Sequence, residues 1–480
     1  QRQLNSFIFR EPLKYYYFIV MRFGLSKLFT HGVLKIVNNF RPICLMSNLG
    51  KVVEAVVRSR VADKIDSLLP SNMFGFRKGK STSDALTKML DTIRAHRANG
   101  QKVAVLALDA TAAFDTISHD VILKSLKFMG AGPKMLAWSK SFLCDCEYFV
   151  QIDSTRSSSW SNGNAGVGQG KKFSPDYYGI GTASQSFWCK IAESSYYADD
   201  GGDVVSGDSD DECQVRLQEV ALQKVEWFKS VGLTLNIPKS EVIGFGFTPM
   251  PINIGNQIIS PSTSCKFLGL TIQNNLKWDL HVTNICNKLR WAAGRIRSEG
   301  HFLGFADKKI LFNGWIMSTL HSNAIAYLPS ISDHQLIQLQ SAMNCGIRAV
   351  VGLPRKSSTS ITDIREKHGI LSVANVRDKC LMLEAYKNRN KFATLNARSR
   401  LNGPCTRSQS RGEIPHPIQK GQLGKMTSTA VEATWNTIPQ VIREEPNPVK
   451  ATRLIKNLLR ISPCTFFPFY YACTHFFTHW

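Results

Sequence analysis

Three aspartates stand at the ends of strand-like runs, where carboxylates can gather to bind divalent metal ions. Asp109 directly follows the apolar run at 103–108. Asp199 and Asp200 lie at the end of a second apolar strand, on a predicted hairpin turn within 194–205. Carboxylates that converge from neighbouring strand ends can hold two Mg²⁺ ions roughly 3.5–4 Å apart, an arrangement that promotes in-line phosphoryl transfer. A single aspartate at such a position is more often a turn or cap residue, so the hypothesis depends on their joint occurrence.

The charge distribution suits a site that handles phosphates. The chain carries 59 Lys and Arg against 36 Asp and Glu, a formal net charge of +23, which favours a polyanionic partner such as nucleic acid or an anionic membrane surface. Against this trend, residues 193–219 are rich in acids, and their only basic residue is Arg216. Metal ions can bridge such carboxylates to phosphates. Four of these acids are interpreted instead as a solvated loop and a helix start: Asp208, Asp210, Asp211 and Glu212.

Hydrophobic periodicity predicts the elements that must position the aspartates. Helical spacing predicts helices over 49–69, 81–97, 118–130 and 211–231, and a mainly helical region over 276–386. Short apolar runs predict strands at 103–108, 233–247 and 266–272. Residues 194–205 are predicted to form two strands joined at Asp200-Gly201, a dipeptide that favours a tight hairpin turn. A Ser-, Asn- and Gly-rich stretch at 151–164 predicts a hairpin or loop.

Length and composition exclude several other classes of protein. With 480 residues, 43% of them hydrophobic and 20% charged, the chain is long enough for two or three globular domains. No apolar run reaches 18 residues, so the sequence predicts no membrane-spanning helix. The 12 cysteines lack the dense spacing of a secreted disulfide scaffold, which favours a reducing intracellular compartment. Because the chain begins at Gln1, we expect a fragment or a decayed copy of a longer protein.

Seven short motifs occur in a fixed order along the chain. They are Asn39-Phe40-Arg41-Pro42-Ile43, Phe74-Gly75-Phe76-Arg77-Lys78-Gly79-Lys80-Ser81-Thr82, Leu108-Asp109-Ala110-Thr111-Ala112-Ala113-Phe114-Asp115-Thr116-Ile117, Gly166-Val167-Gly168-Gln169-Gly170 followed by Ser174-Pro175, Tyr197-Ala198-Asp199-Asp200, Leu235-Asn236-Ile237-Pro238-Lys239-Ser240 and Phe267-Leu268-Gly269. In this order they resemble the reverse transcriptases of non-LTR (LINE-type) retrotransposons. One such motif is weak support for a family, whereas the ordered series is highly specific.

The resemblance implies an RNA-directed DNA polymerase, which transfers a nucleotide from a dNTP to a primer 3′-hydroxyl. In such an enzyme Asp109 and Asp199 bridge the metal ions, Asp200 supports them, and Ala110 offers its backbone carbonyl to one metal. Hard oxygen ligands suit two Mg²⁺ ions, and Mn²⁺ fits the same site. The implied partners are an RNA template, a DNA primer and dNTPs, with no membrane.

The resemblance also assigns residues to the incoming nucleotide. Arg41 would grip the triphosphate, because a guanidinium fork suits phosphate oxygens, and Lys35 would be its companion. Phe114 would close under the sugar and collide with a ribose 2′-hydroxyl; the alternative is plain core packing. Gln169 would lie under the template–nucleotide pair. Lys239 would protonate the pyrophosphate leaving group, or else be a surface cation.

A further set of residues is assigned to the template and the primer. They are Arg77, Lys78, Gly170, Lys171, Phe267, Leu268 and Gly269. Arg77 and Lys78 would touch the template backbone or brace the fingers. The motif at 267–269 would form the hairpin that holds the primer 3′ end.

The chain departs from the family pattern at several positions. Gly168 stands where the family usually has a proline, which loosens the turn. Lys171 and Lys172 replace a usual small residue after Gly170, and we expect them to compensate electrostatically beside the template. Cys144 and Cys146 occupy a stretch where the family often has an arginine.

The expected fold is α+β, a right-hand polymerase with an antiparallel palm sheet backed by helices. We expect an eroded N-terminal segment over 1–34, fingers and palm over 35–275, and a helical thumb or connection over 276–390. A basic, poorly ordered segment is expected over 391–480, where Pro, Ser and Arg are frequent.

Other hypotheses stay open from the sequence alone. The chain could be a catalytically inactive nucleic-acid-binding relic of such an element, although it retains Asp109, Asp199 and Asp200. A group II intron maturase or a telomerase-like enzyme would share the palm chemistry, but the tail after Arg398 does not resemble an RNA-specific domain. Action in the nucleus follows from the resemblance, without an identified targeting signal.

Overall fold

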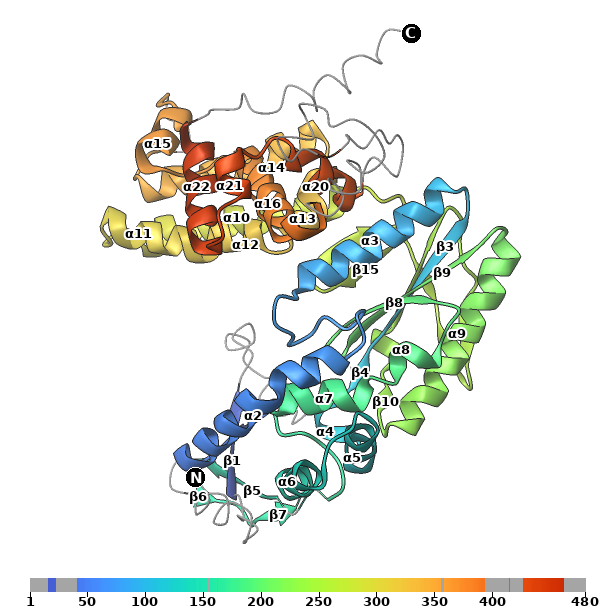
Figure 1. Ribbon diagram of the computed structural model, residues 1–480. Coiled ribbons are helices and arrows are strands. Elements are labelled where there is room, and N and C mark those ends of the chain that lie inside the picture. The colour runs from blue at the N-terminus through green and yellow to red at the C-terminus, as the bar shows by residue number, and fades with distance from the viewer. Residues whose placement is uncertain are drawn as a thin grey trace. The chain divides into compact units, whose positions relative to one another are not determined.

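The structure is a computed structural model that describes residues 16–22, 41–144, 146–152, 155–161, 163–354, 358–392, 414 and 426–461. The chain divides into two compact units, whose elements are labelled in Figure 1. The first unit comprises Gln1–Ala85, Ala104–Gly244 and Thr248–Ser262. The second unit comprises Leu86–Val103, Phe245–Phe247 and Thr263–Trp480.

The main sheet of the first unit carries the three aspartates. Its strands are ordered β14-β11-β3-β9-β8. Their bounds are Lys102–Leu108 (β3), Glu193–Tyr197 (β8), Asp200–Gly207 (β9), Glu241–Phe245 (β11) and Pro261–Ser262 (β14). The central strand β3 is buried along nearly its whole length, as its continuous apolar run requires. The strand predicted at 103–108 is confirmed.

Helices of the first unit are Asn48–Leu68 (α2), Ala113–Thr116 (α4), His119–Phe128 (α5), Pro133–Leu143 (α6), Ser174–Thr182 (α7), Gln185–Trp188 (α8) and Asp210–Ser230 (α9). Of these, α2, α5 and α9 match the helices predicted over 49–69, 118–130 and 211–231, and the others were not predicted. Helix α9 packs on β9 (Figure 1). It also packs on β12 (Ile252–Ile254), which pairs with β13 (Gln257–Ile259). Ser209 caps α9 by accepting a hydrogen bond from the Glu212 amide at 3.1 Å. The acids at 210–212 therefore form a helix start, as predicted.

A second sheet of the first unit contains β1 (Tyr16–Arg22), β2 (Arg41–Leu45), β5 (Glu147–Ile152), β6 (Thr155–Arg156) and β7 (Trp160–Ser161). Strand β1 pairs antiparallel with β2 and parallel with β5. The expectation of an irregular segment over 1–34 is therefore wrong for 16–22, whose aromatic and β-branched residues suit a strand with two partners. The rest of 1–34 lies outside the described residues. Strands β5 and β6 form a hairpin, as predicted within 151–164.

A buried ion pair ties the β8–β9 hairpin to α9. The Lys224 ammonium of α9 lies 2.9 Å from the Asp203 carboxylate of β9, and neither side chain is more than 2% exposed. Tyr196 of β8 donates to the same carboxylate at 3.0 Å and accepts a hydrogen bond from Lys224. Ser194 provides another O–H donor to Asp203. Because buried charges are tolerated only with partners, this network fixes both strands of the hairpin.

The second unit is mainly helical, as predicted for 276–386. Its helices are α3 (Thr82–Ala98, of which most lies in this unit), α10 (Asp279–Glu299), α11 (Phe305–Leu311), the π-helix η5 (Phe312–Met317), α12 (Ser318–His321), α13 (Ala324–Tyr327), the 3₁₀-helix η6 (Leu328–Ser330), α14 (Asp333–Val350), α15 (Ile361–His368) and α16 (Val373–Lys387). Within the described residues, no helix has both the length and the apolar character needed to span a membrane.

Three more helices of this unit lie near the C-terminus: α20 (Thr427–Trp435), α21 (Gln440–Arg443) and α22 (Pro448–Ile461). Helices α20 and α22 pack on α16. The expectation of a poorly ordered segment over 391–480 is therefore wrong for 426–461. The physical reason is visible in α22, where Ala451, Ile455 and Leu459 recur every four residues and are buried on one face. Residues 393–413, 415–425 and 462–480 lie outside the described residues.

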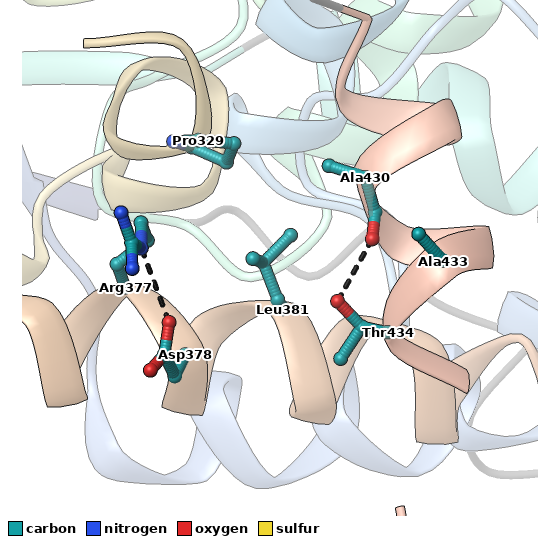
Figure 2. Close-up of a pocket in the computed structure, with 7 residues that line it drawn as sticks. All are labelled: Pro329, Arg377, Asp378, Leu381, Ala430, Ala433 and Thr434. Atoms are coloured by element: carbon teal, nitrogen blue, oxygen red, sulfur yellow. Dashed lines mark hydrogen bonds and ion pairs between the residues drawn. The ribbon is translucent and has the colours of Figure 1, made fainter. Parts of the chain in front are cut away.

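Figure 2 shows a small pocket of the second unit between η6, α16 and α20. Pro329, Leu381 and Ala433 form part of its lining. Arg377 and Asp378 pair at 3.1 Å on α16, and burial raises the pKa of Asp378 while the neighbouring guanidinium opposes that shift. The polar groups at this pocket bond within their own helices, so it marks imperfect packing between helices.

Asp91 of α3 caps helix α20 across 336 sequence positions. Its two carboxylate oxygens accept hydrogen bonds from the Thr427 amide at 2.8 Å and the Ser428 amide at 3.0 Å. Arg94, which is buried, lies 3.7 Å from the same carboxylate. A carboxylate at a helix N-terminus satisfies free amides and complements the helix dipole. The cap therefore anchors the C-terminal helices to α3.

We expect Lys224→Met to lower the free energy of unfolding by about 3–5 kcal/mol, because the Asp203 carboxylate stays buried without its cation. Chemical denaturation followed by circular dichroism measures the change. The matched control is Lys124→Met, which removes a lysine 75% exposed and paired with Asp120. Its effect should be far smaller, since surface ion pairs contribute little. Equal losses in the two variants would contradict the role of the buried pair.

We expect Asp91→Ala to weaken the attachment of α20, with a local loss of about 1–2 kcal/mol because two amides lose their acceptor. Hydrogen exchange over 427–435 should accelerate accordingly. Asp63→Ala, which removes an exposed carboxylate of α2, serves as the control. Unchanged exchange over 427–435 in the Asp91 variant would rule out this cap as the anchor.

Candidate active site

Asp109 is held rigidly at the end of β3. The backbone carbonyl of Asp109 accepts a hydrogen bond from the Asn236 amide at 2.8 Å, and Asn236 Nδ2 donates to Asp109 Oδ2 at 3.0 Å. The Asp109 amide donates to Ser240 Oγ at 3.3 Å. Next to it, β4 (Ala110–Thr111) pairs with β10 (Thr234–Leu235) through the Ala110–Leu235 register. The motif at 235–240 therefore positions Asp109, and Asn236 is a site residue that the sequence analysis quoted without a role.

The segment that follows β10 breaks the strand predicted over 233–247. Residues Ile237–Lys239 form a 3₁₀ turn, η4, before β11 begins. Pro238 lacks an amide donor and favours such a turn over a continuous strand. Lys239 is exposed on this turn, three residues after Asn236.

Asp199 and Asp200 lie on the hairpin between β8 and β9. Tyr197 pairs with Asp200, so the two turn residues are Ala198 and Asp199, and the predicted turn at Asp200-Gly201 is wrong by two positions. Ala198 has a φ of +58°, as the first central residue of a type II′ turn requires. Gly201 lies inside β9, paired with Tyr196, and a Cβ there would meet the Tyr196 ring at 3.2 Å. The small size of this glycine therefore suits packing beside the ring, and it is not part of the turn.

The motif at 74–82 runs alongside this hairpin. The Phe74 amide donates to the Tyr196 carbonyl at 2.8 Å, and the Tyr196 amide donates to the Asn72 carbonyl at 3.0 Å. A Cβ on Gly75 would lie 2.4 Å from the Ala198 nitrogen. Only glycine allows the two backbones to approach this closely.

Tyr178 of α7 is buried within electrostatic reach of the three aspartates. Burial raises the pKa of the Tyr178 hydroxyl above its usual value, and the charges of Asp199, Asp200 and Asp109 raise it further. Tyr178 was not predicted as a site residue, because nothing distinguishes it from its buried neighbour Tyr177 in the sequence.

Phe114 packs against the same tyrosine. The Phe114 and Tyr178 rings stack with their centroids 4.4 Å apart and 10° between their planes. The Phe76 ring meets Phe114 edge-on at 6.0 Å. Phe76 is 49% exposed and has a φ of +59°, an uncommon conformation that is frequent at functional sites. Phe114 is half-buried, so its ring is both fixed and accessible beside the carboxylates.

The turn at 166–170 places Gln169 next to β2. The Gln169 carbonyl accepts a hydrogen bond from the Cys44 amide of β2 at 2.6 Å, and its side-chain amide lies 3.4 Å from Asp115 Oδ2. Gly170 has a φ of +105°, and a Cβ there would lie 2.9 Å from the Cys44 carbonyl oxygen. Strand β2 begins at Arg41, whose side chain lies outside the described residues, as does Lys35.

Two residues predicted at the template are turned inward. The Arg77 side chain is 10% exposed, and its guanidinium bonds to Asp66 Oδ1 at 2.7 Å and the Pro70 carbonyl at 2.6 Å. These contacts brace the end of α2, so the bracing alternative fits and the template contact does not. Lys171 is buried, which contradicts its predicted template contact, because a side chain without solvent access cannot reach a phosphate. Lys78, Gly170 and Lys172 are exposed.

The motif at 267–269 forms a tight turn in the second unit. It joins β15 (Ser264–Phe267) to β16 (Leu270–Gln273), so the strand predicted over 266–272 is a hairpin. Leu268 and Gly269 have φ values of +46° and +87°, as a type I′ turn requires. Asn323 Nδ2 donates to the Leu268 carbonyl at 2.9 Å and fixes the turn.

The donor set suits a hard divalent cation, although it does not form a closed cage. Asp109, Asp199 and Asp200 supply carboxylate oxygens, which Mg²⁺ prefers. Among the described residues, no three His, Cys, Asp or Glu side chains are grouped closely enough to hold a metal ion by themselves. Mg²⁺ in phosphoryl-transfer sites uses one or two carboxylates together with substrate phosphates, so an open arrangement fits this ion.

Comparisons with known proteins agree with this chemistry. The family model described as reverse transcriptase (RNA-dependent DNA polymerase) matches residues 32–272. The RNA-directed DNA polymerase from mobile element jockey of Drosophila melanogaster is 25% identical over 310 residues, which are 61% of this chain and 34% of that protein. The probable RNA-directed DNA polymerase from transposon BS of the same species is 27% identical over 280 residues, 54% of this chain and 30% of that protein. The chain therefore spans about a third of the length of these two relatives.

Among solved structures, telomerase from Candida tropicalis in complex with a fragment of telomeric RNA matches with a TM-score of 0.40 and 13% identity, over 76% of this chain and 67% of that chain. A TM-score of 0.40 is too low to define a fold by itself. The family match covers half of the chain and confirms both the resemblance inferred from the ordered motifs and the α+β right-hand polymerase fold. This chain therefore belongs to the reverse transcriptase (RNA-dependent DNA polymerase) family.

Proposed function

We propose that this chain carries out RNA-directed DNA synthesis for a non-LTR retrotransposon. The observation that carries the proposal is the placement of Asp109 at the end of β3 and of Asp199 and Asp200 on the β8–β9 hairpin of the same sheet. The substrates are a dNTP and a DNA primer with a free 3′-hydroxyl, paired with an RNA template. A net charge of +23 supports binding to nucleic-acid backbones.

The residues that would hold two Mg²⁺ ions, or Mn²⁺ in their place, are Asp109, Asp199 and Asp200 with the Ala110 carbonyl. When bound, the ions lower the pKa of the primer hydroxyl and offset the negative charge on the reacting phosphate. The chain itself contributes preorganisation. Asn236 holds Asp109 in one orientation, and the two-residue turn holds the other two carboxylates, so little rearrangement is needed at the moment of reaction.

Residues from β2 and the turn at 166–170 would bind the nucleotide. Arg41 begins the strand that bonds to the Gln169 backbone. It would bind the triphosphate, because a guanidinium suits phosphate oxygens, and Lys35 would be its companion. Gln169 would pack under the template–nucleotide pair. Lys239 is exposed and close in sequence to Asn236, and it would give a proton to the departing pyrophosphate.

Phe114 would act as a steric filter for the sugar. Its stacking on Tyr178 and its edge contact with Phe76 keep the ring from rotating away. A ring that cannot move aside would collide with the 2′-hydroxyl of a ribonucleotide, so the site would reject that substrate by steric repulsion. This favours deoxynucleotides over ribonucleotides.

Fingers and palm would extend over 35–275 and the thumb over 276–390. Lys78 and Gly170 are exposed and remain assigned to the template, and the hairpin turn at 267–269 to the primer end. Because elements of this kind prime on chromosomal DNA, we place the activity in the nucleus.

We expect Asp199→Asn to lower the rate of primer extension on an RNA template with Mg²⁺ by at least about a hundredfold, since loss of a metal-binding carboxylate removes several kcal/mol of transition-state stabilisation. Asp211→Asn, at the exposed first turn of α9, is the matched control and should retain activity.

The same assay separates the proposal from its alternative. Incorporation by the parent chain that vanishes only in the Asp199 variant supports the polymerase. No incorporation by any of the proteins, with salt-sensitive RNA binding intact in all of them, would identify a nucleic-acid-binding relic and overturn the proposal.

We expect Phe114→Val to reduce the preference for dNTP over rNTP, measured as the ratio of the two kcat/KM values, by about 10- to 200-fold, because a smaller side chain leaves room for the 2′-hydroxyl. Phe128→Ala removes an exposed ring on α5 and should leave the ratio unchanged. An unchanged ratio in the Phe114 variant would assign this ring to core packing alone.

A further inference from the structure

Lys171 lies in a buried box of aromatic rings and thiols. Its side chain is 5% exposed, and Nζ lies 3.9 Å from Cys146 Sγ. Nζ is also 4.7 Å from the centre of the Phe142 ring and 5.8 Å from that of Tyr148. Ring faces attract a cation in a desolvated site. The box therefore holds the lysine inside the protein, although burial lowers its pKa.

The charged and polar groups around this box come from several elements. Glu54 of α2 is buried, and Oε1 accepts a hydrogen bond from the Phe173 amide at 2.7 Å. Its carboxylate and the thiols of Cys146 and Cys44 favour the charged form of Lys171, against the effect of burial. These neighbours make Lys171 a fixed part of the interior under β2 and α2.

A side chain at Gly168 would require the side chains of Lys171 and Cys44 to move. A Cβ at this position would lie 2.9 Å from Lys171 Cε and 2.5 Å from Cys44 Sγ. Gly168 is not among the residues with a positive φ, so its backbone does not require glycine. The requirement comes from the volume that the two neighbouring side chains occupy.

The same three residues clamp the turn that carries Gln169. The Lys171 amide donates to the Gly168 carbonyl at 3.4 Å, and Ser174 Oγ donates to the same oxygen at 2.7 Å. On the other side, the Cys44 amide donates to the Gln169 carbonyl at 2.6 Å. The backbones of Lys171 and Cys44 are therefore bonded directly to the turn that carries Gln169, so a change in the packing of either residue can be transmitted to it.

We propose that Lys171 is a positioning residue for Gln169. The buried aliphatic stem of Lys171 fills the volume under the turn that a side chain at position 168 would occupy, so positions 168 and 171 are coupled. The proposal rests on the proposed function, in which Gln169 packs under the nascent base pair. Lys171 acts through Gln169 and does not contact the nucleic acid. The volume of the Lys171 side chain, and not its charge, positions Gln169. The aromatic rings and thiols around Lys171 accommodate the charge.

A double-mutant cycle on dNTP binding tests the coupling. The Kd of a dNTP is measured for the protein bound to an RNA template with a chain-terminated DNA primer, alongside KM and kcat with an extendable primer. Gly168→Ala and Lys171→Ala should each weaken dNTP binding by about tenfold, because displacement of a positioning group by about 1 Å has large effects. The loss should appear in Kd and KM more than in kcat.

The double variant should lose far less than the product of the two single losses. Removal of the lysine stem gives the Cys44 thiol room to rotate, so the new Cβ enters a cavity and not a filled volume. Losses that simply multiply would overturn the proposal, because they would mean that the two positions act independently.

Two control variants separate volume from charge and from general destabilisation. Lys171→Met keeps most of the volume without the cation and should stay within about threefold of the parent chain. Lys172→Ala removes an exposed neighbouring cation and should leave the dNTP Kd unchanged. A Lys171→Met protein as weak as Lys171→Ala would overturn the volume argument. If Lys171→Ala does not fold, the cycle is repeated with Lys171→Ser and Gly168→Ala, and a cycle of Cys44→Ala with Gly168→Ala tests the second neighbour of the same volume.

The same measurements test the proposed polymerase function separately from the coupling between positions 168 and 171. A parent chain that binds dNTP but incorporates none fails as a polymerase, while the coupling between positions 168 and 171 can still be measured by dNTP binding. A parent chain that binds no dNTP removes the nucleotide that Gln169 would meet, and both proposals then fall.

Discussion

The placement of three carboxylates at the ends of neighbouring strands is the constraint on which the site of the first unit depends. Asp109 lies at the end of β3, and Asp199 and Asp200 lie on the hairpin that joins β8 to β9 in the same sheet. Carboxylates serve one site only when neutral donors and a stiff backbone hold them in place. The Asn236 amide group bonded to Asp109 and the two-residue turn of the hairpin provide that support. The carboxylates remain half-buried or exposed, so substrate phosphates can complete a metal site between them.

Most of the support for this site comes from close backbone contacts and from buried polar groups. Behind the hairpin, the Lys224–Asp203 pair fixes β8 and β9 to α9. In front, Gly75 lets another backbone lie against Ala198. Several family motifs therefore serve the site without touching substrate. This explains why Arg77, a conspicuous cation in such a motif, is used to brace α2.

Much of the fold was predictable because its elements have strong local signals. The helices near 49–69, 81–97 and 211–231, and the buried strand at 103–108, follow from apolar spacing that must match the period of the element. The strand at 16–22 and the helix α20 were not predictable in the same way, whereas α22 carries an apolar period that a local window does show. Their order depends on partners far along the chain: β1 pairs with β2 and β5, and α20 is capped by Asp91 from α3. Long-range pairing leaves no mark in a local window.

For the site, the residue types already predict the chemistry: the ordered motifs and the placement of Asp109, Asp199 and Asp200 at strand ends indicate nucleotidyl transfer, since carboxylates suit metal ions that bind phosphate. Which neighbours surround these residues depends on the tertiary structure. The Asp-Gly pair at 200–201 signals a turn, yet Gly201 pairs with Tyr196 inside the hairpin and the turn falls at Ala198-Asp199. Lys171 carries a charge that suggests solvent, yet Phe142, Tyr148 and Cys146 enclose it. Residue type sets what a side chain can do, whereas its direction depends on packing between segments that the sequence does not place together.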